Sequence, residues 1–142
     1  MKTIHVAAAV ILKDGKVYAT QRGYGDYKDG WEFPGGKIEP GETPDQALIR
    51  EIREELDIGI VPEEKLCTVE SDYPAFRLRM ECFLCRMSEG TPVLKEHEAA
   101  RWLDEEALDS VDWLPADRSV LPQIRIALQA RQGKADGKDA AR

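Results

Sequence analysis

The sequence predicts a single α/β or α+β sandwich. Two observations carry this prediction: several short segments have the apolar or alternating pattern of strands, and two longer segments have the pattern of helices. A chain of 142 residues is long enough for one domain with a full hydrophobic core. We expect that domain to span residues 1–132, and the polar residues 133–142 to form a disordered tail.

The first two predicted strands cover residues 3–12 and 16–22, joined by a turn at Asp14-Gly15. The apolar run of the first strand is too short for a signal peptide, and no stretch approaches the roughly 20 apolar residues of a membrane span. We therefore expect a cytoplasmic protein without a membrane partner.

The remaining elements follow from turn residues and periodicity. GYGDYKDG is a polar, glycine-rich loop, and WEFPGGKIEPGE is a short strand followed by a loop. Further on, the pattern predicts strands over 65–71, 76–87 and 99–103, a helical turn in DEEALDS, and a last helix over 119–131 with Pro122 near its start.

Charge and cysteine content narrow the class of function. The formal net charge of −7 argues against a nucleic-acid partner, but it allows a small phosphorylated ligand accompanied by a metal ion. Cys82 and Cys85 form a C-x-x-C in an alternating strand, where positions three apart face opposite sides, and no second pair completes a zinc site. His5 and His97 are far apart in sequence and lack metal-ligand spacing.

The clearest helix begins after Thr43, which is placed as the N-cap. Pro44 suits the first helical position, and Gln46 completes a capping-box pattern. An apolar stripe at 100° per residue should pack on a sheet, and it consists of Leu48, Ile49, Ile52 and Leu56.

Three glutamates crowd the same helix. Glu51, Glu54 and Glu55 fall within a sector of about 100°, opposite the apolar stripe. Like charges at this spacing destabilise a helix, so a divalent cation such as Mg²⁺ or Mn²⁺ between them would account for the arrangement. Gly35 and Gly36 precede the helix, and a backbone without Cβ atoms can approach a ligand closely and offer it a carbonyl. The alternative is an acidic helix face that is only solvated.

The segment from Gly36 to Ile58 resembles the Nudix box, G-x5-E-x7-R-E-U-x-E-E-x-G-U, where U is a bulky aliphatic residue. The matching residues are Gly36, Glu42, Arg50, Glu51, Ile52, Glu54, Glu55 and Ile58. The one departure is Asp57, which stands where the family has glycine just past the helix. Asp adopts the left-handed conformation better than most residues, and no carboxylate is lost.

The resemblance implies an α/β/α sandwich with a mixed sheet and a loop–helix–loop catalytic unit. It also implies hydrolysis of a nucleoside diphosphate linked to another group, with Mg²⁺ as cofactor and Mn²⁺ as a substitute. In this sequence the implied metal ligands are Glu51, Glu54 and Glu55, with the Gly35 carbonyl beside them.

The resemblance also assigns supporting roles. Arg50 would orient a glutamate, Glu42 and Gly36 would brace the loop, and Glu51 or another glutamate of the cluster would take the proton of the attacking water.

Outside the box the chain resembles the MutT-like branch, which cleaves (deoxy)nucleoside triphosphates to the monophosphate and pyrophosphate. Arg22 then contacts phosphate, and Lys37 in the lead-in to the box is a further substrate contact. Glu96 matches an additional acidic ligand or base, although Glu98 competes for that role.

Two positions of this branch concern the base of the nucleotide. Asp117 matches the residue that reads the base, although Asp is also favoured as a helix N-cap. Phe33 and Trp31 either line the base pocket or belong to the core.

The substrate therefore stays open between two bases. A carboxylate accepts hydrogen bonds from the guanine edge or from the cytosine amino group. We favour 8-oxo-dGTP, with (d)CTP or a modified dCTP as the alternative. An ADP-ribose or dinucleoside polyphosphate hydrolase is less consistent with the sequence, and so is a binding module without chemistry, because all glutamates of the box remain. We expect a monomer or a homodimer.

Overall fold

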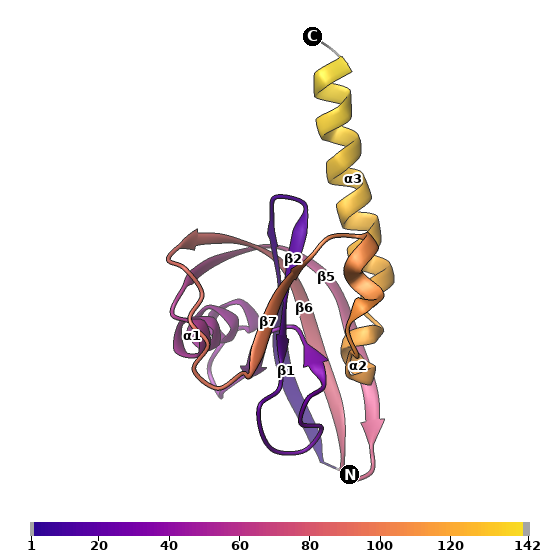
Figure 1. The fold of residues 1–142 in the computed structure, drawn as a ribbon. Coiled ribbons are helices and arrows are strands. Elements are labelled where there is room, and N and C mark those ends of the chain that lie inside the picture. The colour runs from indigo at the N-terminus through magenta and orange to yellow at the C-terminus, as the bar shows by residue number, and fades with distance from the viewer. Residues whose placement is uncertain (1, 141–142) are drawn as a thin grey trace.

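Figure 1 shows the computed structural model, which describes the backbone of residues 2–140 and the side chains of residues 2–131. The elements follow one another as β1 (Thr3–Lys13), β2 (Lys16–Gln21), β3 (Trp31–Glu32), β4 (Gly35–Lys37), α1 (Pro44–Leu56), β5 (Gly59–Tyr73), β6 (Phe76–Glu89), β7 (Ala99–Leu103), the 3-10 helix η1 (Glu106–Ser110), α2 (Pro115–Arg118) and α3 (Leu121–Ala140). Among the described residues, no helix is both long and apolar enough to cross a bilayer.

The strands form one mixed sheet. Its main path runs β3-β2-β1-β6-β5, while β4 pairs with β1 and β7 pairs with β2. β1 runs parallel to β6, from Thr3 opposite Arg77 to Ile11 opposite Cys85, and antiparallel to β2 and β4. The predicted α/β class with a mixed sheet is confirmed.

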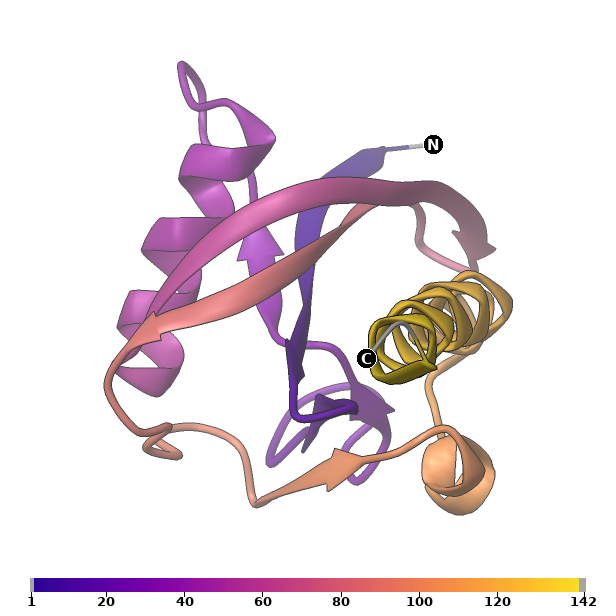
Figure 2. The ribbon, with the colours of Figure 1, turned by 90° about the horizontal axis from the view of Figure 1, so that it is seen from above.

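Helices cover both faces of the sheet, as Figure 2 shows with α1 and α3 on opposite sides of β1. Alternate residues of β1 serve the two cores: Ala7 and Ile11 pack with residues of α1, while Ala8 and Val10 pack with residues of α2 and α3. A strand buried on both faces reads as a continuous apolar run, which explains the VAAAVIL stretch.

The ends of α1 form as the sequence predicts. The Gln46 amide donates to Thr43 Oγ1 at 3.2 Å, and the Thr43 amide donates to Gln46 Oε1 at 3.0 Å. Asp57 caps the C-terminus in the left-handed conformation, with φ of 57°. Its amide donates to the Arg53 carbonyl, so the aspartate replaces the glycine of the motif without breaking the cap.

The predicted orientation of α1 is partly wrong. Ile49 is 43% exposed, whereas Ala47, which the pattern puts in the acidic sector, is fully buried. The buried face is turned toward Ala47, and Glu55 lies about 20° from the buried Leu48 around the helix because the two are seven residues apart. The acidic sector therefore borders the buried stripe instead of opposing it.

Several boundaries also differ from the prediction. β5 spans Gly59–Tyr73, longer than the predicted 65–71, because its pairing with β6 includes register shifts that break the alternation. The last helix begins at Leu121 and continues to Ala140, through most of the segment 133–142 that we expected to be a tail. The segment contains no proline that would end the helix. Residues 141–142 lie outside the described residues.

Candidate active site

Two cavities adjoin and share part of their lining. The first, of about 170 Å³, has mostly apolar walls, and we call it the apolar cavity; it is lined by Val6, Phe33, Phe76, Leu78, Met80 and Leu114, among others. The second, of about 430 Å³, is the acidic cavity, lined by Tyr24, Lys37, Glu55, Glu96 and His97, among others. Arg22, Glu32 and Gly35 line both cavities and mark where they meet.

The two glycines before α1 bring strand and helix together at this junction. Gly35 opposes Ala8 in the β1–β4 pair, and a Cβ on Gly35 would lie 2.0 Å from the Ala7 carbonyl oxygen. A Cβ on Gly36 would lie 2.4 Å from the carboxyl carbon of Glu51. Gly35 therefore requires glycine, because a Cβ there would meet backbone atoms, whereas at Gly36 the Glu51 carboxylate packs directly on the β4 backbone and would have to shift.

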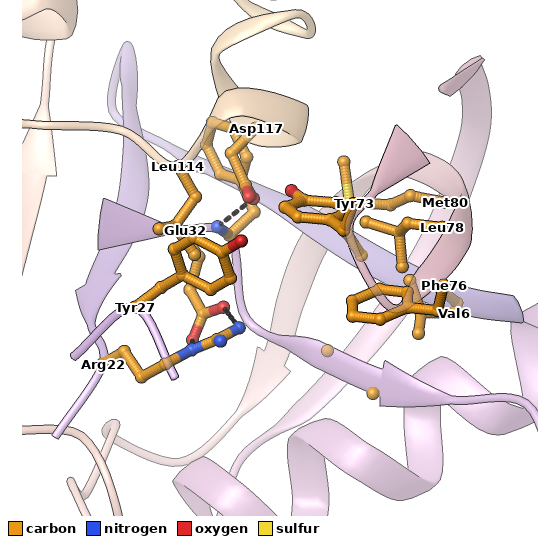
Figure 3. A pocket seen from close by; sticks show the side chains of 15 residues that line it. Val6, Arg22, Tyr27, Glu32, Tyr73, Phe76, Leu78, Met80, Leu114 and Asp117 are labelled. Atoms are coloured by element: carbon orange, nitrogen blue, oxygen red, sulfur yellow. Dashed lines mark hydrogen bonds and ion pairs between the residues drawn. The ribbon is translucent and has the colours of Figure 1, made fainter. Parts of the chain in front are cut away.

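Asp117 projects into the apolar cavity from α2 (Figure 3). The segment before α2 is held beside β3, where the Trp31 amide donates to the Asp112 carbonyl at 2.9 Å and the Leu114 amide donates to the Trp31 carbonyl at 2.9 Å. Asp117 Oδ1 then accepts the Phe33 amide at 2.9 Å. The N-cap of α2 is Leu114, so the N-cap reading of Asp117 is wrong.

Burial changes the pKa of the Asp117 carboxyl. The residue is 5% exposed, and burial is the largest cause that raises the pKa of its carboxyl to about 7. The Phe33 amide lowers this pKa and the charge of Glu32 raises it. A polar group in this apolar wall can select among bases, because an unmatched hydrogen bond there is costly.

Aromatic rings form much of the apolar wall. Tyr27 and Tyr73 meet edge to face with centroids 5.5 Å apart, and Tyr73 stacks on Phe76 at 5.0 Å. Phe33 lines the cavity and stacks on Trp113 at 4.5 Å. No local sequence pattern marks these tyrosines, since they meet only through the β5–β6 hairpin and the loop after β2.

Trp31, the other aromatic considered for the base pocket, belongs to the core. It is 6% exposed, and the Arg101 guanidinium lies 5.3 Å from its ring centroid.

Arg22 and Glu32 form an ion pair where the cavities meet. Arg22 Nη2 donates to Glu32 Oε1 at 2.6 Å, and Nη1 donates to the Asp26 carbonyl at 2.9 Å. Arg22 therefore lines both cavities, and its role as a phosphate contact stays a prediction. Glu32 was not predicted, because nothing in WEF distinguishes a glutamate facing a cavity from a solvated one.

Arg50 donates hydrogen bonds to carboxylates of α1 and of the loop before it. It donates to both oxygens of Glu42 at 2.7 and 2.8 Å, to Glu51 Oε1 at 2.9 Å and to Glu54 Oε2 at 3.4 Å. Its hydrogen bonds, and then the Glu39 amide, lower the pKa of the Glu42 carboxyl to about 2. This is the geometry expected of a residue that orients Glu51 and of a brace for the loop, although both roles stay predictions.

Among the described side chains, none forms a salt bridge with Glu55. Its Oε2 is buried without a hydrogen-bond partner in the described part of the chain. Burial, followed by the charges of Glu51, Glu32 and Glu96, raises the pKa of its carboxyl to about 8. An orphaned carboxylate oxygen among further carboxylates fits a divalent cation with oxygen ligands.

The predicted metal ligands lie near one another, but they do not form a complete metal site. Within the described residues, no three His, Cys, Asp or Glu side chains are grouped closely enough to hold a metal ion as they stand. Glu51 and Glu54 instead face Arg50. The described carboxylates would therefore have to rearrange before three of them could hold a cation.

The segment before β7 supplies the opposite wall of the acidic cavity. Glu96 lines it and accepts the Tyr24 hydroxyl at 3.3 Å, whereas Glu98 lies 3.7 Å from Lys28 Nζ and does not line it. Lys37 lines the cavity from β4, and its carbonyl accepts Arg50 Nη2 at 3.1 Å.

His97 also lines the acidic cavity and was not predicted from the sequence. Its side chain is 8% exposed, and burial lowers its pKa. In the sequence, only its position beside Glu96 marks His97 as a candidate. The Glu32 carboxylate lies 3.8 Å from His97 Nε2, but Glu32 is distant in sequence.

Comparison with known proteins decides the family. The model of the NUDIX domain matches residues 2–124. The chain belongs to the Nudix family. It is 35% identical over 125 residues to an 8-oxo-dGTP diphosphatase of Haemophilus influenzae, covering 87% of this chain and 92% of the relative. It is also 35% identical over 132 residues to a CTP pyrophosphohydrolase of Escherichia coli, covering 92% and 98%.

Solved structures agree with the fold. The crystal structure of a MutT Nudix hydrolase from Burkholderia pseudomallei superposes with a TM-score of 0.79 at 27% identity, covering 87% of this chain and 98% of that one. The predicted resemblance to the MutT-like Nudix hydrolases is confirmed. Nudix hydrolases generally use divalent cations.

Proposed function

We propose that this Nudix hydrolase cleaves (deoxy)nucleoside triphosphates to the monophosphate and pyrophosphate, with 8-oxo-dGTP as its preferred substrate. The observation that carries this proposal is the pair of adjoining cavities. One offers aromatic walls and a single buried carboxyl, and the other offers carboxylates with a lysine and an arginine at its edge. A nucleotide, with an aromatic base at one end and a polyphosphate at the other, matches this division.

The polyphosphate and a metal ion would share the acidic cavity. Glu51, Glu54, Glu55 and Glu96, with the Gly35 carbonyl, would hold Mg²⁺, or Mn²⁺ in its place. When bound, the metal neutralises and orients the polyphosphate and lowers the pKa of the attacking water.

The protein's own groups complete the chemistry. Arg22 and Lys37 contact phosphate oxygens, and the ion pair of Arg22 with Glu32 fixes the arginine between the two cavities. Glu51 accepts the proton of the attacking water, and the 2.9 Å contact with Arg50 orients its carboxylate for that step.

The base would stack in the apolar cavity and bond to Asp117. An ionised Asp117 accepts hydrogen bonds, which suits the N1–H and amino group of a guanine edge, or the amino group of cytosine. We favour 8-oxo-guanine, which would make the protein a sanitiser of the nucleotide pool in support of DNA repair. The alternative substrate, (d)CTP or a modified dCTP, is supported by the equally similar CTP pyrophosphohydrolase.

Other activities have less support. ADP-ribose and dinucleoside polyphosphates call for a second nucleoside or sugar site beyond the acidic cavity. A module that binds without chemistry would not need all the glutamates of the box, which this chain keeps. We propose a small-molecule substrate without a nucleic-acid partner, a monomer or homodimer, and a cytoplasmic location, consistent with three free cysteines.

A substrate panel tests the proposal. Release of pyrophosphate and phosphate is measured with Mg²⁺ for 8-oxo-dGTP, dGTP, dCTP, 5-methyl-dCTP and ADP-ribose. We expect a triphosphate to give the monophosphate and pyrophosphate, with 8-oxo-dGTP cleaved most efficiently. Preference for dCTP would select the alternative, and cleavage of ADP-ribose alone would overturn the proposal.

A further inference from the structure

Two cysteines that are not adjacent in sequence face each other across neighbouring strands. Cys67 of β5 and Cys82 of β6 are paired Cα partners in the antiparallel ladder. Directly opposed residues of such a ladder have Cα atoms about 4.5–5.5 Å apart, within the range of about 4.4–6.8 Å that a disulfide spans. Both side chains pack in the same core cluster, on the face covered by α2 and α3. The thiols are therefore neighbours on one side of the sheet.

Cys85 is excluded from this pairing by the geometry of β6. It lies three residues after Cys82 and packs in the other core cluster, under α1. The C-x-x-C of the sequence thus points to opposite faces, as its alternation predicts, and cannot close on itself. Cys85 is fully buried, and burial raises the pKa of its thiol to about 12.

The paired thiols differ in exposure, which divides their roles. Cys67 is half-buried and Cys82 is fully buried. The neighbouring Cys82 thiol, and to a smaller extent the charge of Lys65, lowers the pKa of Cys67 to about 7, although burial opposes this. The neighbouring Cys67 thiol, followed by burial, raises the pKa of Cys82. Cys67 is the accessible nucleophile, because the thiolate is the reactive form.

We propose that Cys67 and Cys82 are an oxidant-reactive dithiol, which hydrogen peroxide converts to an intramolecular disulfide. The Cys67 thiolate attacks one peroxide oxygen and breaks the O–O bond, which gives a sulfenic acid and hydroxide. The hydroxide then takes up the proton that the Cys67 thiol released, which gives water. The Cys82 thiol then attacks the sulfenic sulfur, and the sulfenic oxygen leaves as a second water. Both thiols are oxidised together by two electrons, and one peroxide is reduced.

The dithiol lies next to the apolar cavity. Met80, two residues before Cys82 on the same face of β6, lines that cavity and opposes Val69 of β5. The charge of Asp117 is among the causes that raise the pKa of Cys82. A disulfide here would tie β5 to β6 and close a loop that contains the hairpin bearing Tyr73 and Phe76. It would therefore stabilise the strands that form the aromatic wall.

The test uses the native 142-residue chain and does not depend on catalysis. The protein is reduced, treated with a small excess of hydrogen peroxide and quenched, and thiols are counted after denaturation. We expect the count to fall from three to one and the mass to fall by about 2 Da, with a linked Cys67–Cys82 peptide that dithiothreitol releases. The oxidised form should melt about 5 °C higher, since the cross-link restricts the unfolded chain.

Variants identify the thiols. Cys85→Ala serves as the matched control and should still lose two thiols, whereas Cys67→Ser and Cys82→Ser should form no intramolecular disulfide. A linkage that contains Cys85, a disulfide between two chains, or stable oxygen addition at Cys67 with Cys82 still free would overturn the proposal. So would a disulfide that forms in urea but not in the folded protein. Failure of the substrate panel would leave all of these outcomes unaffected.

Discussion

The two cavities of the site are built in opposite ways. The apolar cavity is an extension of the core: its walls are packed rings and aliphatic side chains, and the buried carboxyl of Asp117 is anchored by the Phe33 amide. The acidic cavity gathers carboxylates that repel one another, and the Oε2 atom of Glu55 is left without a partner. The apolar cavity therefore depends on packing, while the acidic cavity stores unfavourable electrostatics that a bound cation would relieve.

The largest effect that separates the two cavities is expected for Glu55→Gln. Removing a buried carboxylate that neighbours Glu51, Glu32 and Glu96 should stabilise the metal-free protein by about 1–2 kcal/mol at pH 8. The same change should lower kcat by about 10²–10⁴, because a metal ligand is lost. Thermal unfolding with and without Mg²⁺, together with steady-state kinetics, measures both effects.

Glu70→Gln is the matched control for this experiment, since Glu70 is an exposed glutamate of β5 outside both cavities. It should change neither quantity. A destabilised Glu55→Gln variant with full activity would mean that Glu55 is an ordinary structural residue.

Asp117→Asn should change the pH dependence of stability. The pKa of Asp117 is raised to about 7 in the folded protein, from its ordinary value of 3.8. The folded protein therefore binds this proton more tightly than the unfolded chain does, and the resulting stabilisation is complete below pH 3.8. This contribution is lost as the pH rises through 7. The asparagine keeps the acceptor for the Phe33 amide but does not titrate. Relative to wild type, the variant should gain up to about 4 kcal/mol between pH 4 and pH 8.

Urea unfolding at several pH values measures this difference. Parallel stability curves for wild type and variant would contradict the burial of an ionisable Asp117. Arg118→Gln, an exposed neighbour on α2, serves as the control and should leave the shape of the curve unchanged.

The smallest effect compares two glutamates two residues apart. Glu96→Gln should lower kcat about tenfold, because Glu96 lines the acidic cavity, whereas Glu98→Gln should leave kcat unchanged, because Glu98 faces Lys28 outside it. Kinetics at saturating Mg²⁺ distinguish the two. Loss in the Glu98 variant alone would reverse the assignment.

Local sequence signals predicted the catalytic helix well. The capping box at Thr43, the left-handed Asp57 and the crowding of glutamates all depend on residues within one helix. Even there, the exposed Ile49 shows the limit: its place in the stripe depends on how the helix is rotated against the sheet, which periodicity does not determine.

Residues that reach the site through long-range pairing were harder to predict. Glu32 meets Arg22 because β3 pairs with β2, and His97 meets Glu32 because β7 pairs with the other edge of β2. Tyr73 reaches the apolar cavity through the turn between β5 and β6. No local pattern marks these residues, whereas Arg22, Glu96 and Asp117 were found through resemblance to the MutT-like branch.

The most direct test of the division between the cavities compares two variants over the same substrate panel. Values of kcat/KM for Glu54→Gln and Asp117→Ala are measured for 8-oxo-dGTP, dGTP, dCTP and 5-methyl-dCTP. We expect Glu54→Gln to lower every value by a similar factor, about 10²–10⁴, and to preserve the ranking of bases. Asp117→Ala should instead compress the ranking. An equal loss for all bases in Asp117→Ala, or a changed ranking in Glu54→Gln, would contradict the division into a base cavity and a phosphate cavity.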